Sequence, residues 1–252
     1  MLNLIEILNS LLNKFSFQVR IKVRSMLSPV RLLDDEMLFV TREILLENVY
    51  HNSQWLDVGC GLKPFADNFN HAHYTGIDVE VSGRSGGLKN PDKFFDGMTI
   101  PYNDNKFDGI LSTQVLEHVE NLDILLAEIN RCLKINGKFI LSVPFVFREH
   151  EQPFDYRRFT SYGIILALTR NGFQVSSCLK CLSAIETIAT IFSVYISNNI
   201  GSKNRFLHVL TGIFLIMPSL TLSKFLSRIL PDDKDLFCVL ISCAIKVSNI
   251  KG

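Results

Sequence analysis

Short apolar segments that alternate with helical segments from residue 54 onward constrain the fold of this chain most. Six of them have the length and composition of buried strands, and they cover residues 54–58, 73–78, 93–96, 107–112, 138–143 and 173–179. Between the fourth and the fifth, residues 121–134 place leucines and isoleucines on one helical face, and Asn136-Gly137 is expected to stop this helix. The alternation predicts an α/β fold with a doubly wound, mostly parallel sheet.

Two helical segments and a seventh strand complete the expected organisation. Residues 2–50 have helical spacing, and a helix from Asp34 to Val49 leads into the first strand. Residues 182–234 form an apolar block that we interpret as a helical insertion, and the continuous apolar run 235–247 predicts the last strand. We therefore expect an N-terminal helical segment (1–50), a core (51–181 and 235–250) and the insertion (182–234).

The composition favours a globular domain and excludes a general nucleic-acid binder. Hydrophobic residues make up 47% of the chain and charged residues 20%, which allows a large core. The 26 Lys and Arg residues against 25 Asp and Glu leave no basic surplus for phosphate contacts. Six cysteines scattered through apolar segments indicate reduced thiols in the cytoplasm. Cys178 and Cys181 are interpreted as strand residues, and no metal site is expected.

A glycine pair follows the first predicted strand in the sequence LDVGCGLKPF, residues 56–65. Gly59 and Gly61 have no Cβ atom, so the backbone can approach a ligand closely, and Asp57 precedes them. In a doubly wound sheet, the carboxyl ends of the strands form the usual ligand crevice. Lys63-Pro64 stands where a dinucleotide-binding loop usually has its third glycine. This loop is therefore predicted to bind a nucleoside-type ligand without a pyrophosphate.

Acidic residues also end the next two predicted strands. Asp78 lies 21 residues beyond Asp57, where a carboxylate can accept hydrogen bonds from both ribose hydroxyls. Asp96 ends the third strand and is placed to bind an adenine amino group. Each acid alone could equally be a turn or cap residue, but three acids at the ends of three successive strands favour a nucleoside site.

These motifs together resemble those of class I S-adenosylmethionine-dependent methyltransferases of the type 11-like kind. The matching segments are WLDVGCG, YTGIDVE, FFDGMTIPYNDNKFDGILSTQVLEHV and EINRCLKINGKFILSVP, and the resemblance covers residues 54–175 and recurs at 235–247. It implies a seven-stranded Rossmann-like methyltransferase fold and S-adenosylmethionine as the cofactor. The resemblance assigns Asp57, Gly59 and Gly61 to the methionine end, Asp78 to the ribose, Val79 to the adenine face, Asp96 and Gly97 to the adenine edge, and Ser112 and Thr113, after strand four, to the amino-acid moiety.

Three side chains near the predicted crevice are candidates for catalysis. His118 follows the fourth strand in VLEHV, and His150 and Tyr156 lie in REHEQPFDYRRFT after the fifth. A hydroxyl acceptor needs a general base, and these side chains are the types that serve. His118 could instead only brace its loop, and the arginines of residues 148–160 could pair with the acids there to hold that segment together.

Residues 148–160 also resemble the signature eHe-P-DyyRyT of a methyltransferase subgroup found in polysaccharide and cell-envelope biosynthesis. The resemblance implies O-methylation of a sugar or lipid-linked glycan. Two alternatives stay open, namely methylation of a small lipophilic molecule such as a quinone precursor, and a non-catalytic cofactor-binding scaffold at a membrane.

The basic N-terminus and the apolar insertion together suggest a cytoplasmic protein in peripheral contact with the inner face of a membrane. Residues 1–33 contain five Lys or Arg residues against Glu6 alone, and residues 182–230 are too apolar for a solvated lid. A homodimer interface or additional core is the alternative use of the insertion. The most apolar stretch, 206–222, contains His208 and Pro218, so a membrane span is not favoured. The N-terminus has no features of a secretory signal.

Overall fold

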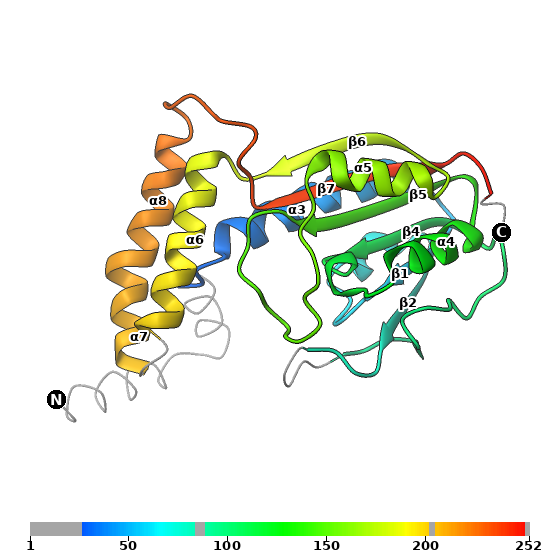
Figure 1. The fold of residues 1–252 in the computed structure, drawn as a ribbon, viewed down its shortest axis with the longest axis horizontal. Coiled ribbons are helices and arrows are strands. Elements are labelled where there is room, and N and C mark those ends of the chain that lie inside the picture. The colour runs from blue at the N-terminus through cyan, green and yellow to red at the C-terminus, as the bar shows by residue number, and fades with distance from the viewer. Residues whose placement is uncertain (1–26, 84–88, 202–204, 250–252) are drawn as a thin grey trace. The chain divides into compact units, whose positions relative to one another are not determined.

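A computed structural model describes residues 27–83, 89–201 and 205–249 (Figure 1). The chain divides into two compact units, one made of residues 1–36 and 182–236 and the other of residues 37–181 and 237–252. The second unit contains the sheet, and the first is helical where it is described. Most of the predicted N-terminal helical segment lies outside the described residues.

The sheet has seven strands in the order β3-β2-β1-β4-β5-β7-β6, and β7 is antiparallel to both of its neighbours. The strands are β1 (Gln54–Val58), β2 (His73–Val79), β3 (Lys93–Phe95), β4 (Phe107–Thr113), β5 (Leu133–Pro144), β6 (Phe173–Cys181) and β7 (Val239–Lys246). The predicted doubly wound, mostly parallel sheet is therefore confirmed. Its strand order reverses between β1 and β4, and this switch point is where such sheets bind ligands.

Three helices of the sheet unit are α3 (Arg31–Asn48), which begins in the helical unit, α4 (Leu122–Cys132) and α5 (Ser161–Arg170). Helix α4 buries Leu125, Leu126 and Ile129 in the core. The predicted stop at Asn136-Gly137 is wrong, because α4 ends at Cys132 and β5 begins at Leu133. Leu133 pairs with Phe107 ahead of a bulge, so Asn136 and Gly137 lie inside the strand.

The helical unit contains two antiparallel helical stretches that lie side by side (Figure 1). The first is α6 (Ala184–Asn199), which begins with a capping box between Ser183 and Glu186. The second runs through α7 (Arg205–Thr211), the π-helical turn η4 (Gly212–Ile216) and α8 (Met217–Leu226). Pro218 lies in the first turn of α8, directly after η4, and does not end the helix. The stretch in which the sequence does not favour a membrane span is continuously helical from Leu207 to Leu226, and by length and composition it could cross a membrane.

Candidate active site

The loop after β1 turns at the predicted glycine pair. Gly59 has a φ of +78° and Gly61 a φ of +52°, in the left-handed region that favours glycine. A Cβ atom on Gly59 would lie 2.3 Å from Cγ2 of Val115, which follows β4, so the loop passes close to the neighbouring strand's end. Alanine at position 59 would therefore be both strained and crowded.

Lys63 has a structural use that the sequence did not reveal. Its side chain packs beside Gly76 of β2, and its Nζ lies 2.7 Å from Oδ1 of Asp92. The same Asp92 accepts a hydrogen bond from the Gly76 nitrogen at 2.7 Å. Lys63 thus ties the loop to the edge of β2, although its φ of 57° lies in the left-handed region that favours glycine.

Asp57 is buried below the loop. The Tyr74 hydroxyl donates to Oδ2 of Asp57 at 2.5 Å, whereas Oδ1 has no hydrogen-bond partner among the described residues. Burial raises the pKa of the Asp57 carboxyl to about 7, although the hydrogen bond from Tyr74 opposes this shift. The unsatisfied oxygen is an acceptor that a ligand's donor group would complete.

Asp78 joins the glycine loop to a lysine. Its Oδ2 accepts from the backbone nitrogen of Gly61 at 2.9 Å, and its Oδ1 lies 3.1 Å from Nζ of Lys89. Lys89 also donates to the Val79 carbonyl at 2.7 Å. Because Asp78 is 7% exposed, a ribose that binds to its carboxylate must compete with Lys89. No motif in the sequence pointed to Lys89.

The ends of β2 and β3 lie together at the predicted adenine site. Gly97 has a φ of +82°, and a Cβ atom there would lie 3.3 Å from Cγ1 of Val79. Asp96 is exposed, and its Oδ1 accepts from the backbone nitrogens of Met98 and Thr99 at 2.8 and 2.7 Å. These hydrogen bonds lower the pKa of the Asp96 carboxyl. Asp96 therefore has the turn role that the sequence left open, and its adenine contact stays a prediction.

Ser112 and Thr113 lie within β4 rather than after it, because the pairing with β5 continues to Thr113 and Ser142. Ser112 is fully buried, and its hydroxyl has no hydrogen-bond partner within the described part of the chain. Thr113 is half-buried. The chain leaves the strand at Gln114, which has a φ of 54° and bonds to Ser142 through both its backbone and side-chain nitrogens. The contact of Ser112 and Thr113 with the cofactor stays a prediction.

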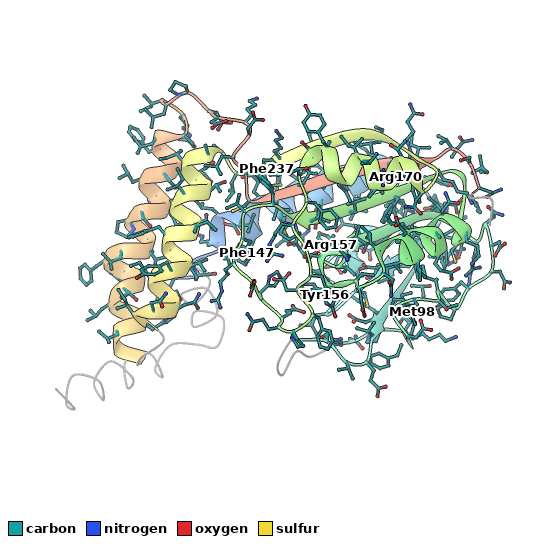
Figure 2. All side chains as sticks on the ribbon, viewed as in Figure 1. Met98, Phe147, Tyr156, Arg157, Arg170 and Phe237 are labelled. Atoms are coloured by element: carbon teal, nitrogen blue, oxygen red, sulfur yellow. The ribbon has the colours of Figure 1, made fainter. Side chains whose placement is uncertain are left out.

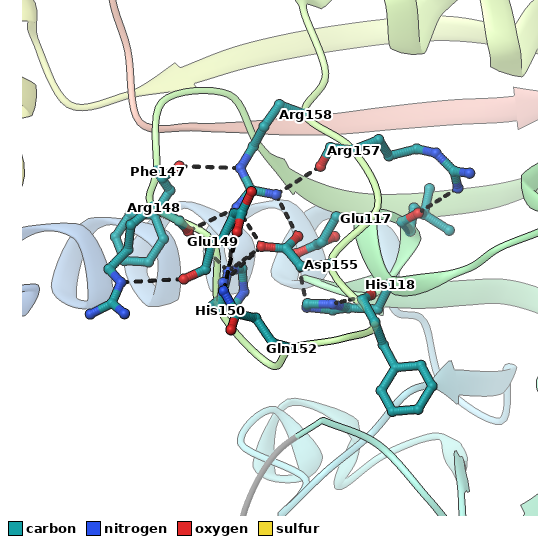
Figure 3. A network of polar contacts seen from close by, with 12 residues as sticks. Glu117, His118, Phe147, Arg148, Glu149, His150, Gln152, Asp155, Arg157 and Arg158 are labelled. Carbon is teal, nitrogen blue, oxygen red and sulfur yellow. Dashed lines mark hydrogen bonds and ion pairs between the residues drawn. The ribbon is translucent and has the colours of Figure 1, made fainter.

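His118 and His150 meet beyond the carboxyl ends of β4 and β5 (Figure 3). Their ring centroids are 4.8 Å apart in an edge-to-face arrangement. Nδ1 of His118 lies 3.0 Å from the Phe154 carbonyl, which can only accept, so Nδ1 carries the hydrogen and Nε2 has the lone pair. Burial lowers the pKa of His118, which favours the neutral ring. Nδ1 of His150 lies 3.2 Å from Oδ2 of Asp155.

Glu117 lies beside this histidine pair and was not among the predicted residues. It is fully buried, and neither carboxyl oxygen has a hydrogen-bond partner among the residues that the structure describes. Oε1 is 3.8 Å from Nε2 of His118, too far for a hydrogen bond. Burial raises the pKa of Glu117 to about 8. The sequence signal that could have pointed to Glu117 was its position next to His118 in the segment VLEHV.

The arginines after β5 hold the loop in place, as the sequence allowed. Arg158 donates to both oxygens of Asp155 at 2.6 and 2.7 Å, and these bonds outweigh burial and lower the pKa of Asp155 to about 2. Arg157 donates to the backbone carbonyls of three residues around the short helix η2 (Leu116–His118), namely Leu116, Val119 and Glu120. The arginines therefore fix the position of the loop relative to His118.

Tyr156 contributes its backbone to this arrangement. Its nitrogen donates to the Glu117 carbonyl at 3.0 Å, while its side chain is 45% exposed (Figure 2). The loop also reaches the segment after β2, because a Cβ atom on Gly83 would lie 1.7 Å from the Glu151 carbonyl oxygen. The structure thus brings the histidine pair and the carboxyl end of β2, where Asp78 is predicted to bind the ribose, to the same edge of the sheet. A catalytic role for Tyr156 stays a prediction.

Comparison with known proteins agrees with this architecture. A model of the methyltransferase domain family matches residues 31–174, more than half of the chain. An uncharacterized protein of Methanocaldococcus jannaschii is 30% identical over 207 residues, which cover 80% of each chain. A sterol 24-C-methyltransferase of Gibberella zeae is 36% identical over 97 residues, 33% of this chain and 26% of that protein.

Solved structures share the fold at low sequence identity. The cyclase SpnF has a TM-score of 0.51 at 18% identity, with coverage of 82% of this chain and 80% of that one. A Haemonchus contortus phosphoethanolamine N-methyltransferase, crystallised with phosphomonomethylethanolamine and S-adenosylhomocysteine, has a TM-score of 0.50 at 15% identity; the match covers 88% of this chain and 58% of that one. With the sheet order, the glycine loop and the family match together, the chain belongs to the S-adenosylmethionine-dependent methyltransferases.

Proposed function

We propose that this methyltransferase transfers a methyl group to a hydroxyl of a sugar or of a lipid-linked glycan in cell-envelope biosynthesis. The observation that carries the proposal is the meeting of His118 and His150, 4.8 Å between ring centroids, at the carboxyl ends of β4 and β5. A hydroxyl must lose its proton during methylation, and imidazole is the side chain suited to accept it near neutral pH. The likeness of residues 148–160 to the envelope-biosynthesis signature supports a glycan acceptor.

The residues of the β1 and β2 edge fit S-adenosylmethionine. Gly59 and Gly61 give the loop its left-handed turn beside the methionine end, and Asp57 offers an unsatisfied buried oxygen below it. Asp78 would bind the ribose, and Val79 and Gly97 would flank the adenine. When bound, the cofactor supplies a methyl group activated by its sulfonium charge.

The chain's own contribution to the reaction is placement and proton transfer. His118 is held by its hydrogen bond to Phe154, so its Nε2 lone pair has a fixed direction. In the proposed reaction this nitrogen would accept the hydroxyl proton, and S-adenosylmethionine would supply the methyl group through cleavage of its S–CH₃ bond and leave as S-adenosylhomocysteine. Asp155 holds His150 against it, since Oδ2 of Asp155 also accepts from the His150 backbone nitrogen at 2.8 Å. Arg158 keeps Asp155 ionised for this purpose.

Transfer of an isotope-labelled methyl group from S-adenosylmethionine to an envelope extract tests the proposal. We expect label in the glycan fraction, detected by mass spectrometry as an added CH₂ group. His118→Asn and His150→Asn should lower kcat by roughly 10²–10⁴ while leaving the cofactor Kd unchanged, and the exposed His51→Asn should have no effect. Full activity of His118→Asn would contradict the assigned base.

A second candidate acceptor is a small lipophilic molecule of the quinone type. The observation that favours it is the row of large apolar side chains exposed on α6 and α8. The partial similarity to a sterol methyltransferase supports the same idea. Label that appears in the non-glycosylated, organic-soluble fraction of the same extract would select this candidate over the glycan.

A further inference from the structure

The two helical stretches of the first unit bury hydroxyl-bearing and aliphatic residues together and expose larger apolar ones. Thr190, Ser193 and Ser223 are buried, beside an aliphatic cluster of Ala189, Ile196, Ile216 and Leu220. Large apolar side chains are exposed on the outside, among them Ile188, Phe192, Tyr195, Phe214, Leu222 and Phe225. In water, burial of the large apolar side chains would stabilise the pair more.

The contacts between the helices are partly polar. Oγ of Ser193 on α6 lies 3.1 Å from Oγ of Ser219 on α8. The buried hydroxyls of Thr187 and Thr190 have no hydrogen-bond partner within the described residues. Small residues and serine or threonine contacts are typical of helix interfaces in lipid, where surrounding hydrocarbon removes the advantage of hiding leucine and phenylalanine.

The length and charge of the second helical stretch match the thickness of a bilayer. Its 20 residues from Leu207 to Leu226 include an 18-residue window with a mean hydropathy of 1.7, of which only 28% is buried, unlike the core helix of a soluble protein. No Asp, Glu, Lys or Arg occurs between Arg205 and Lys224. These two residues are about 28 Å apart along an α-helix, close to the roughly 30 Å of bilayer hydrocarbon.

Exposure around the second helix distinguishes lipid from a protein partner. Ile213, Phe214 and Leu215 are consecutive and all exposed. Consecutive residues of a helical turn point in different directions, so these three side chains face more than one side of the helix. A second copy of the chain would cover one face, whereas hydrocarbon surrounds a helix on all open sides.

We propose that the helical hairpin of α6 and α7–η4–α8 inserts into the hydrocarbon of a lipid bilayer. Lys224, near the C-terminal end of the second helical stretch, would then lie at the headgroups. This inference goes beyond the proposed methyl transfer and holds whichever acceptor is methylated. A homodimer interface on the same face is the competing outcome.

Flotation of the full chain with phosphatidylcholine vesicles, with and without phosphatidylglycerol, tests the insertion. We expect the protein to float with both and to stay bound in high salt and in alkaline carbonate. Phe192→Lys and Phe214→Lys should each reduce vesicle binding at least about tenfold. Tyr162→Lys makes the same change at an 84% exposed site on α5 and should have no effect. Release by salt, or binding that survives both hairpin substitutions, would overturn the proposal.

A tryptophan placed in the hairpin gives a second readout that does not depend on loss of binding. Trp55 is the only tryptophan of the chain and is 1% exposed, so the wild type supplies a constant background. Fluorescence of Phe214→Trp should be quenched by phosphatidylcholine brominated on its acyl chains, and that of Tyr162→Trp should not. An unquenched Phe214→Trp protein that forms dimers by light scattering would assign this face to a second copy instead.

Discussion

Replacement of the buried Glu117 by glutamine tests how ionisation of an unpaired carboxyl group in the active site affects the stability of the protein. Glu117 is fully buried, and its oxygens have no hydrogen-bond partner among the described residues. Glutamine has nearly the same shape and no charge. Glu117→Gln therefore removes the ionisation of this group while it leaves the packing around η2 in place.

The magnitude follows from the pKa of Glu117, which burial raises from its ordinary 4.5 to about 8. Because the folded pKa is raised, the folded state binds the proton more tightly than the unfolded state, and stability falls as the pH rises from about 4.5 to about 8. A shift of this size corresponds to as much as about 5 kcal/mol above pH 8, or roughly 10–20 °C in Tm. Glu117→Gln should match the wild type near pH 4.5 and exceed it increasingly up to about pH 8.

Thermal unfolding followed by Trp55 fluorescence across this pH range provides the assay. Trp55 lies in β1 of the same unit as Glu117, so its emission reports the relevant transition. Glu47→Gln removes an exposed carboxyl from α3 and is the matched control, with no expected change in the pH dependence. If Glu117→Gln were instead less stable than the wild type by an amount that grows as the pH rises, Glu117 would be ionised and paired in the native protein, and the reasoning would be wrong.

Three further substitutions test the cofactor site, the sheet and the acceptor loop. Asp78→Ala should weaken S-adenosylmethionine binding at least about tenfold in calorimetry, because it removes a charged acceptor that also holds Gly61. Unchanged affinity would refute the ribose assignment. Gly109→Ala should lower the free energy of unfolding by about 1–3 kcal/mol in urea titrations, because its Cβ would lie 2.3 Å from the Trp55 ring; an unchanged midpoint would show that the ring can move away. Arg157→Met should lower kcat in steady-state assays but not cofactor affinity, since Arg157 holds only the loop carbonyls near η2; a weaker cofactor Kd would contradict this.

The sheet was predictable from sequence because its strands are buried on both faces and therefore read as short continuous apolar runs. The boundaries of the helices and strands were less predictable than the sheet itself, because they depend on pairing with residues far along the chain. Leu133 continues the helical pattern of α4, yet it is the first residue of β5 because it pairs with Phe107 across the bulge. Local periodicity contains no information on that pairing, so the helix was expected to extend toward Asn136.

The candidate site likewise has parts that the local sequence predicts and parts that depend on distant residues. The position of Asp57 and Asp78 at one edge of the sheet was predictable, because parallel strands bring their carboxyl ends to the same edge whatever the side chains then contact. Lys63 was not understood from its sequence position, because its partner Asp92 is 29 residues away. Glu117 drew no attention because only the folded chain shows that its carboxyl is sealed from solvent.

Hydropathy alone does not decide which way the helices of the apolar insertion face. A helix pair in water is expected to place its large apolar residues inward. The structure buries Thr190 and Ser193 together with a small aliphatic cluster and exposes Phe192, which lies between these two residues in the sequence. Average hydropathy is the same for both arrangements, because it sums over the helix and ignores direction. The direction is set by the facing helix, whose Ser219 meets Ser193, and the large apolar side chains left outside are the surface that the proposed lipid contact would use.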